Sequence, residues 1–239
     1  MNNFFQKITR NRLTIPFTPF YRRYPYRSGI SINSADARGC IDTRLGFFCN
    51  RIPKAANSTI VENLARLSFG EDVPSKLAKK RFTVPSQLSR SEVDKVDIMF
   101  RFAVVRNPFT RTLSAYLDKV ERRDRNAQRE SNFFDFLQGL ANGKLYSNAH
   151  WAPQHSLLLL PFDDFDFFGK VESLDSDLNH IRAKISGRPG AESIKTFKAN
   201  ATGAGKKLQE YYNEDTVGMV QELFHKDFEL FEYSRELPA

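Results

Sequence analysis

Residues 45–70 contain, in order, a short apolar segment, a tight turn and an amphipathic helix. The opening LGFFC predicts a buried strand, and the spacing of Ile60, Leu64 and Leu67 predicts a helix that Gly70 ends. Where a strand leads through a tight turn into a helix, the first N–H groups of the helix have no partner within it. The positive end of the helix dipole also lies at the turn, so the turn suits an anion. This stretch therefore predicts an α/β fold with a phosphate-type ligand at the turn.

Side chains in the turn add to this anion site. Lys54 contributes a cation, and Ser58 and Thr59 contribute two hydroxyl donors. The spacing differs from the GxxxxGK(S/T) loop of nucleoside triphosphatases, because here the lysine precedes the hydroxyl pair by four residues. For this turn alone, the alternative is a basic loop that only caps the helix.

Two more strands are expected further along the chain. Residues 97–105 form an apolar strand that ends at Arg106, and Asn107 and Pro108 suit the start of a helix running to about residue 122. Residues 165–171 predict a third strand, followed by an amphipathic helix. Strands that alternate with helices predict a single α/β domain with a P-loop-type central parallel β-sheet flanked by helices, which binds ligands beyond the carboxyl ends of its strands.

The rest of the chain is expected to surround this sheet. Residues 1–40 predict a basic and aromatic arm or an irregular cover, and residues 41–239 predict the domain itself. Residues 70–94 predict a long loop with a short helix at 75–81, and further short helices are expected at 133–141 and within 206–231.

Composition is that of a globular protein, with 41% apolar and 27% charged residues, and the net charge is +8. Six basic residues precede the first acid, Asp36: Lys7, Arg10, Arg12, Arg22, Arg23 and Arg27. Two interpretations remain open, a solvated basic arm and a surface that attracts an anionic cofactor or acceptor.

A cytoplasmic location is expected. No apolar run reaches the roughly 18 residues of a membrane span, and no secretion signal is recognisable. Cys40 and Cys49 are too few for a disulfide framework, so both are expected to be reduced and structural. Asn57 begins a glycosylation sequon inside the anion-binding turn, where a glycan would obstruct the site in a secretory lumen.

The turn also resembles a known motif. RIPKAANST, residues 51–59, is similar to the 5′-phosphosulfate loop of sulfotransferases that use 3′-phosphoadenosine-5′-phosphosulfate (PAPS), in particular those acting on carbohydrates. The resemblance implies that this loop binds the cofactor through Arg51, Pro53, Lys54, Ala55, Ala56, Asn57, Ser58 and Thr59.

A second motif, VVRNPFTRTLSAY at 104–116, resembles the 3′-phosphate site of the same enzymes and implies that Arg106 and Ser114 hold that phosphate. Arginine suits this task because its planar fork donates two hydrogen bonds and stays charged. Asn107 stands where the family usually has Asp, a change that preserves helix capping.

Two further segments extend the resemblance to carbohydrate sulfotransferases of family 2, the group related to the chondroitin enzymes. HWAPQ at 150–154 and the GKVESL segment at 169–174 are similar to that group, as is the end of the chain from 211 to 233. The arm before residue 44 and the loop at 70–95 fall outside the resemblance, and two cysteines common in animal members are absent.

The resemblance implies in-line transfer of a sulfuryl group from PAPS to a hydroxyl of a carbohydrate, without a metal. Lys54 would stabilise charge on the leaving oxygen, and His150 would be the base that takes the acceptor proton. His155 and Glu92 are rival bases. Thr202 and Lys206 lie in a Gly-rich segment that either closes over the nucleotide or stays solvated.

Two other functions remain as alternatives. One is a P-loop-type small-molecule kinase, which is disfavoured because no Walker-type Lys-Ser/Thr pair is present. The other is a non-enzymatic polyanion-binding module that uses the basic arm and its aromatic residues. The expected partner is a carbohydrate acceptor, and the positive net charge of the protein is compatible with an anionic one. No specific nucleic acid partner and no transmembrane segment are expected. The acceptor and the oligomeric state do not follow from the sequence.

Overall fold

The computed structural model describes residues 13–121, 132–187 and 203–238. Its centre is a four-stranded sheet in the order β1 (Gly39–Asp42), β2 (Phe47–Asn50), β3 (Phe100–Val105) and β4 (Phe167–Lys170). Strands β2, β3 and β4 are parallel, and β1 runs antiparallel to β2. The predicted α/β fold with a central sheet flanked by helices is confirmed, and the predicted parallel arrangement holds for β2, β3 and β4 but not for β1. Strand β1 was not predicted.

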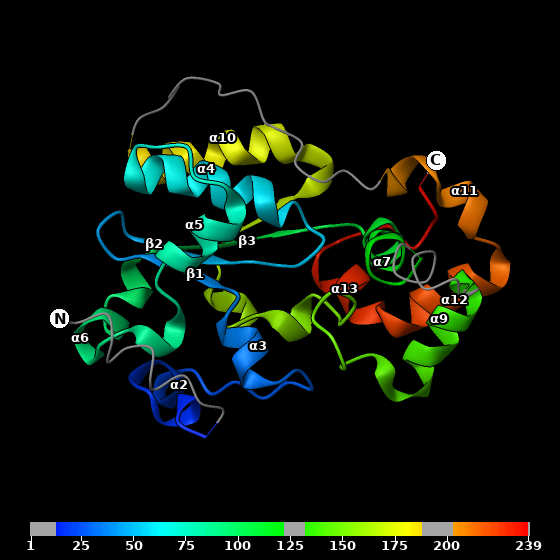
Figure 1. Ribbon diagram of the computed structural model, residues 1–239, viewed down its shortest axis with the longest axis horizontal. Coiled ribbons are helices and arrows are strands. Elements are labelled where there is room, and N and C mark those ends of the chain that lie inside the picture. Colours follow the sequence, from blue (N-terminus) through cyan, green and yellow to red (C-terminus); the bar gives the residue numbers. More distant parts are fainter. Residues whose placement is uncertain (1–12, 122–131, 188–202, 239) are drawn as a thin grey trace.

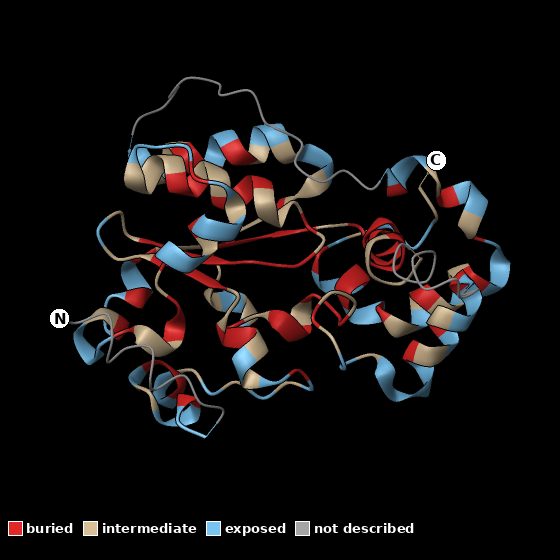
Figure 2. Ribbon diagram, in the orientation of Figure 1, coloured by how far each residue is buried: buried red, intermediate tan, exposed pale blue. Residues whose placement is uncertain are grey.

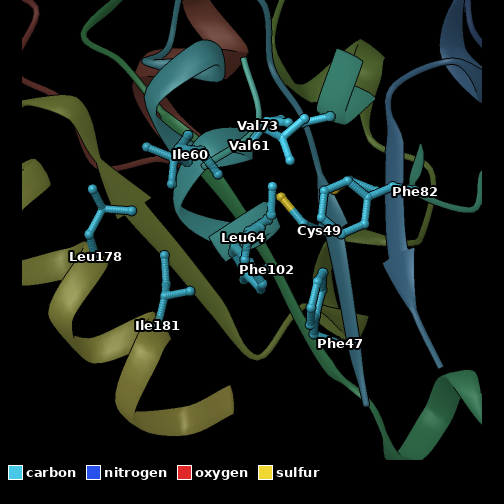
Figure 3. Close-up of a cluster of buried hydrophobic side chains, with 14 residues drawn as sticks. Phe47, Cys49, Ile60, Val61, Leu64, Val73, Phe82, Phe102, Leu178 and Ile181 are labelled. Atoms are coloured by element: carbon cyan, nitrogen blue, oxygen red, sulfur yellow. The ribbon is translucent and has the colours of Figure 1, made fainter. Parts of the chain in front are cut away.

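One face of the sheet is covered by α4 (Asn57–Phe69), α5 (Ser75–Arg81) and α10 (Leu174–Ser186) (Figure 1). Side chains alternate along a strand, so Phe47 and Cys49 of β2 and Phe102 of β3 point to this face and pack among the helix residues Leu64 and Ile181 (Figure 3). The helix predicted to end at Gly70 ends there, and Gly70 has a left-handed φ of 70°.

The opposite face is covered by the N-terminal segment. It contains η1 (Ile15–Phe17), α2 (Pro19–Arg23) and α3 (Ile32–Asp36). Phe20 is fully buried and stacks on Phe48 of β2 at a centroid distance of 5.7 Å. In the described part of the expected arm, short helices joined by irregular segments therefore pack on the sheet, because their aromatic side chains find apolar surface there.

A helical cluster lies beyond the carboxyl ends of the parallel strands (Figure 1). It consists of α7 (Pro108–Tyr116), the π-helical turns η4 (Leu117–Glu121) and η5 (Leu140–Lys144), α9 (Phe133–Gly139), α11 (Leu208–Tyr211), α12 (Glu214–Leu223) and α13 (His225–Leu230). Helix α7 is buried along its whole length and is surrounded by the others (Figure 2). The carboxyl edge of the sheet is thereby enclosed, which positions the residues that follow each strand.

Short helices fill the connections. They are η2 (Pro85–Gln87), α6 (Arg90–Val93), η3 (Val96–Ile98), η6 (His155–Leu157), η7 (Phe162–Asp164), η8 (Val171–Ser173) and η9 (Ala204–Lys206). Strand β3 begins at residue 100 instead of the predicted 97 because η3 occupies the intervening residues. The short helix predicted at 75–81 is α5. In the described part of the chain, no helix is long and apolar enough to cross a membrane.

Candidate active site

The loop between β2 and α4, residues 51–56, lies at the carboxyl edge of the sheet. Lys54 and Ala56 adopt left-handed backbone conformations, with φ of 69° and 49°, which are uncommon for residues other than glycine. No side chain caps the first turn of α4. Strained residues next to an uncapped helix N-terminus are the backbone arrangement that presents N–H groups to an anion.

The Lys54 ammonium lies inside this site. Its Nζ donates to Oδ2 of Asp118 at 3.0 Å, and its side chain is only 12% exposed. Burial lowers the pKa of Lys54, and the contact with Asp118 opposes that shift. Burial acts to raise the pKa of Asp118, but hydrogen bonds and charges from Lys54 and Lys119 outweigh it and bring the pKa to about 2. Lys54 is therefore a cation already held by an anion.

Arg106 connects the two predicted phosphate motifs. Its Nη1 donates to the backbone carbonyl of Lys54 at 3.2 Å, and its Nε donates to Oγ1 of Thr110 at 2.9 Å. Burial lowers the pKa of Arg106, partly offset by the charge of Glu172. The arginine at the end of β3 thus contacts the loop at the end of β2, although the two residues are 52 positions apart.

Ser114 lies on the same side of α7 as the Arg106 contact. Thr110 and Ser114 are four residues apart in this helix, so they share one face. Ser114 is buried, with 3% exposure. Arg106, Thr110 and Ser114 therefore follow one line that leads from the loop along α7.

Arg51 directly follows β2 and is 4% exposed. Its guanidinium donates to the carbonyl oxygen of Ala37 and, at 3.4 Å, to Oδ1 of Asn57, the first residue of α4. The Nε atoms of Arg51 and Arg38 are both buried without a hydrogen-bond partner among the described residues. Burial and the charge of Arg51 lower the pKa of Arg38 to about 10. Burial lowers the pKa of Lys79, and the nearby charges of Arg51 and Arg38 lower that pKa further. These cations and orphaned donors fit a multiply charged anion.

Arg111 is a residue whose role sequence reasoning missed. It is 1% exposed and lies in α7 among apolar side chains. Its guanidinium donates to the carbonyls of Pro53, Ala152 and Ala149, at 3.0, 2.8 and 3.3 Å respectively. It thus joins the anion-binding loop to the loop that contains HWAPQ. A charged residue between Phe109 and Leu113, both on the apolar face of the predicted helix, is the signal that could have drawn attention to it.

The HWAPQ loop is fixed by two buried polar side chains. Gln154 exchanges hydrogen bonds with the backbone of Arg106, accepting from its N at 2.9 Å and donating to its O at 2.8 Å. Asp227 of α13 is fully buried and accepts from the backbone N of Gln154 and of His155. The His155 ring also contacts Asp227, Nδ1 to Oδ1 at 2.7 Å. His155 is thereby tied to the C-terminal helix.

His150 is held differently. Asn148 Oδ1 accepts from the backbone N of His150 at 3.0 Å and lies 2.8 Å from ring Nδ1. Because the backbone N–H needs an acceptor, the amide atom facing the ring is oxygen, so Nδ1 carries the proton and Nε2 has the free lone pair. Burial, then the charges of Lys119, Arg38, Lys54 and Arg111, lower the pKa of His150 to about 4. The ring is therefore a neutral imidazole within the field of these cations.

Lys206 and Thr202 were also predicted to bind the cofactor, and Glu92 was predicted as a rival base. Lys206 is exposed, and its short helix η9 packs against α7 through buried Ala204. Thr202 lies outside the described residues. Glu92 accepts from the backbone N and hydroxyl of Ser89 and so caps α6, which precedes the start of β3 at the opposite end of the sheet (Figure 1). In the described residues, no group of three or more His, Cys, Asp or Glu side chains is placed to hold a metal.

The fold and the site together define an α/β protein in which a loop suited to bind an anion follows one parallel strand and a buried arginine follows the next. A family model described as "Sulfotransferase family" matches residues 39–234. The chain belongs to this family, as its motifs predict.

Two curated relatives were found. Carbohydrate sulfotransferase 11 of Rattus norvegicus and that of Mus musculus are each 23% identical over 181 residues, which is 62% of this chain and 51% of the relative. The chain thus spans about half the length of these relatives. No solved structure matches the chain.

Proposed function

We propose that this protein transfers a sulfuryl group from PAPS to a hydroxyl of a carbohydrate. The observation that carries the proposal is the hydrogen bond from Arg106 Nη1 to the carbonyl of Lys54, because it joins the two motifs predicted to hold opposite ends of one nucleotide. Family membership and the names of the two relatives support the choice of donor and acceptor class.

The roles of the residues follow from what each side chain offers. The uncapped N-terminus of α4 and Lys54 would bind the 5′-phosphosulfate, and Lys54 would stabilise the charge that forms on the leaving phosphate oxygen. Arg106 and Ser114 would bind the 3′-phosphate. The family resemblance assigns the loop from Arg51 to Thr59 to the site that binds the 5′-phosphosulfate.

His150 is proposed as the base. In the transfer, the acceptor oxygen forms a bond to sulfur while the bond from sulfur to the phosphate oxygen breaks, and the hydroxyl proton leaves to a base. The free Nε2 of His150 can accept that proton. The base that takes the proton from the acceptor hydroxyl must itself be unprotonated at neutral pH, and the low pKa of His150 meets that condition.

The experiment that tests this function measures binding first and transfer second. Calorimetry should give clear selectivity for 3′-phosphoadenosine-5′-phosphate over ATP, with or without magnesium. A kinase would instead prefer ATP with magnesium, and a polyanion binder would show no nucleotide selectivity. Purified protein with ³⁵S-labelled PAPS should then label at least one member of a glycan panel. Selective binding without transfer to any glycan would contradict the carbohydrate acceptor.

We also propose a cytoplasmic, reducing location. Cys40 and Cys49 are direct partners in the β1–β2 ladder, and both are free buried thiols. Burial raises the pKa of Cys49 to about 12, which keeps its thiol protonated and unreactive. Fractionation of the source cells, followed by detection of the protein, tests the location. Recovery in an exported or membrane fraction would contradict it.

A further inference from the structure

A cavity of about 650 Å³ lies beside the candidate active site. One wall is residues 25–34, which comprise the loop after α2 and the start of α3, together with Pro16 and Tyr21; the other is the loop 146–149. These two segments lie next to each other in the lower centre of Figure 1, where the loop before α3 approaches the chain that follows α9. The cavity is therefore built by parts of the chain more than a hundred positions apart.

The cavity adjoins both the proposed base and the anion-binding loop. Asn148, a wall residue, is the side chain that orients the His150 ring. Ile30, another wall residue, is buried and packs in one cluster with Ala55 of the loop and with Ala149. A molecule in this cavity would lie next to the residues to which the transfer reaction is assigned.

The cavity is lined by groups suited to a sugar. The ring of Tyr146 lies directly on Gly29, where an added Cβ would be 2.5 Å from Tyr146 Cγ, and Tyr146 as a residue is 41% exposed. Exposed aromatic rings stack on the apolar faces of sugars, and hydroxyls such as those of Ser31 and Ser147 can bond to sugar hydroxyls. Glycine at position 29 allows the two walls to meet.

One lining residue is charged. Arg27 is exposed, and no acid among the described residues forms an ion pair with it. The other lining side chains are neutral. A single cation in a neutral, hydroxyl-rich cavity selects a ligand that carries an anionic group, and arginine binds carboxylate or sulfate through two parallel hydrogen bonds.

We propose that this cavity is the acceptor site and that Arg27 makes it prefer saccharides bearing an acidic group. The proposal rests on the proposed function and adds the class of acceptor and the residue that selects it. Residues 25–34 lie before the region that the family model matches, so this wall is a feature of the chain outside the matched family region.

The test of Arg27 uses paired acceptors. Uronate-containing oligosaccharides, prepared from hyaluronan, unsulfated chondroitin and alginate, are compared with the same oligosaccharides after their carboxylates are reduced to alcohols. For acidic acceptors, Arg27→Gln should raise KM roughly three- to tenfold, the effect of losing one charge-assisted contact at a partly exposed site. For the reduced acceptors it should change little. Arg22→Gln removes an exposed charge from the neighbouring helix α2, outside the cavity, and is the matched control.

A second experiment tests the cavity itself by filling it with a large side chain. Ser147→Trp should abolish labelling of the saccharide while binding of 3′-phosphoadenosine-5′-phosphate stays at the wild-type level, which shows that the variant is folded. Gln138→Trp places the same bulk on an exposed position of α9 outside the cavity and should leave labelling intact.

Failure of this inference differs from failure of the proposed function. Transfer by the wild type with an unchanged acidic preference in Arg27→Gln would overturn the role of Arg27. Transfer that survives in Ser147→Trp would overturn the acceptor cavity. Absence of selective nucleotide binding by the wild type would instead overturn the proposed function, and the acceptor assignment with it.

Discussion

Lys54 and Asp118 form an ion pair between the anion-binding loop and the π-helical turn η4, with Nζ and Oδ2 3.0 Å apart. Both side chains are mostly buried, at 12% and 22% exposure. An incoming phosphosulfate would compete with Asp118 for the same ammonium. The pair therefore holds the lysine in position before the nucleotide binds, and it places a negative charge where an anion must approach.

Replacement of Lys54 by alanine should lower turnover by about 10²- to 10³-fold, because the cation acts on charge that develops during transfer. Binding of the product 3′-phosphoadenosine-5′-phosphate should weaken far less. Asp118→Asn is the companion variant, and it should tighten binding of that nucleotide because it removes the competing negative charge. Steady-state kinetics and calorimetry measure both effects. Near-normal turnover of Lys54→Ala would remove it from the catalytic residues.

Replacement of Arg106 by alanine should abolish the preference for 3′-phosphoadenosine-5′-phosphate over 5′-AMP. The loss should be about 2–3 kcal/mol, the size of a charge-assisted contact that is largely shielded from water. Arg101→Ala is the matched control, because Arg101 is on the same strand but pairs with Asp166 at the far end of it. Calorimetry with the two nucleotides decides the matter, and an undiminished preference would exclude a 3′-phosphate site at Arg106.

The pH dependence of the reaction should show His150 as a base. A base loses activity when it is protonated, so kcat/KM should fall as the pH decreases toward about 4, the pKa of His150 in the free protein. The corresponding decrease in kcat should occur at a higher pH than the decrease in kcat/KM. The negative charge of bound PAPS offsets the surrounding cations that help to lower the pKa of His150, so this pKa is higher in the complex. His150→Ala should show low turnover and no such decrease. His155→Gln should keep the decrease, and if instead it alone loses it, the base is His155.

Arg111 should be important for stability. In Arg111→Met, the carbonyls of Pro53, Ala149 and Ala152 lose their donor inside the protein, which should cost about 3 kcal/mol or more of the free energy of unfolding. Arg66→Met is the control, since Arg66 forms an exposed ion pair with Asp72 and its loss should cost less than about 1 kcal/mol. Urea denaturation measures both. Similar losses for the two variants would contradict the bridging role of Arg111.

The strand–turn–helix units were predictable from the sequence because each is determined by contacts within a few residues. The apolar run before Arg51, the helical spacing from Ile60 and the left-handed stop at Gly70 are local properties, and the structure has each of them. Asn107 caps α7 by accepting from the N–H of Phe109, as its position before Pro108 indicates. The family followed from the same local strings.

The assembly of the site was decided by the tertiary structure. The contacts of Lys54 with Asp118 and of Gln154 with Arg106 join residues 64 and 48 positions apart, and no window of sequence contains both partners. Strand β1 has only four residues and is formed by its pairing with β2. The N-terminal segment has no clear periodicity of its own, and it folds because Phe20 finds apolar surface on the sheet. Burial and long-range pairing depend on the whole fold, whereas turns, caps and helical spacing are determined locally.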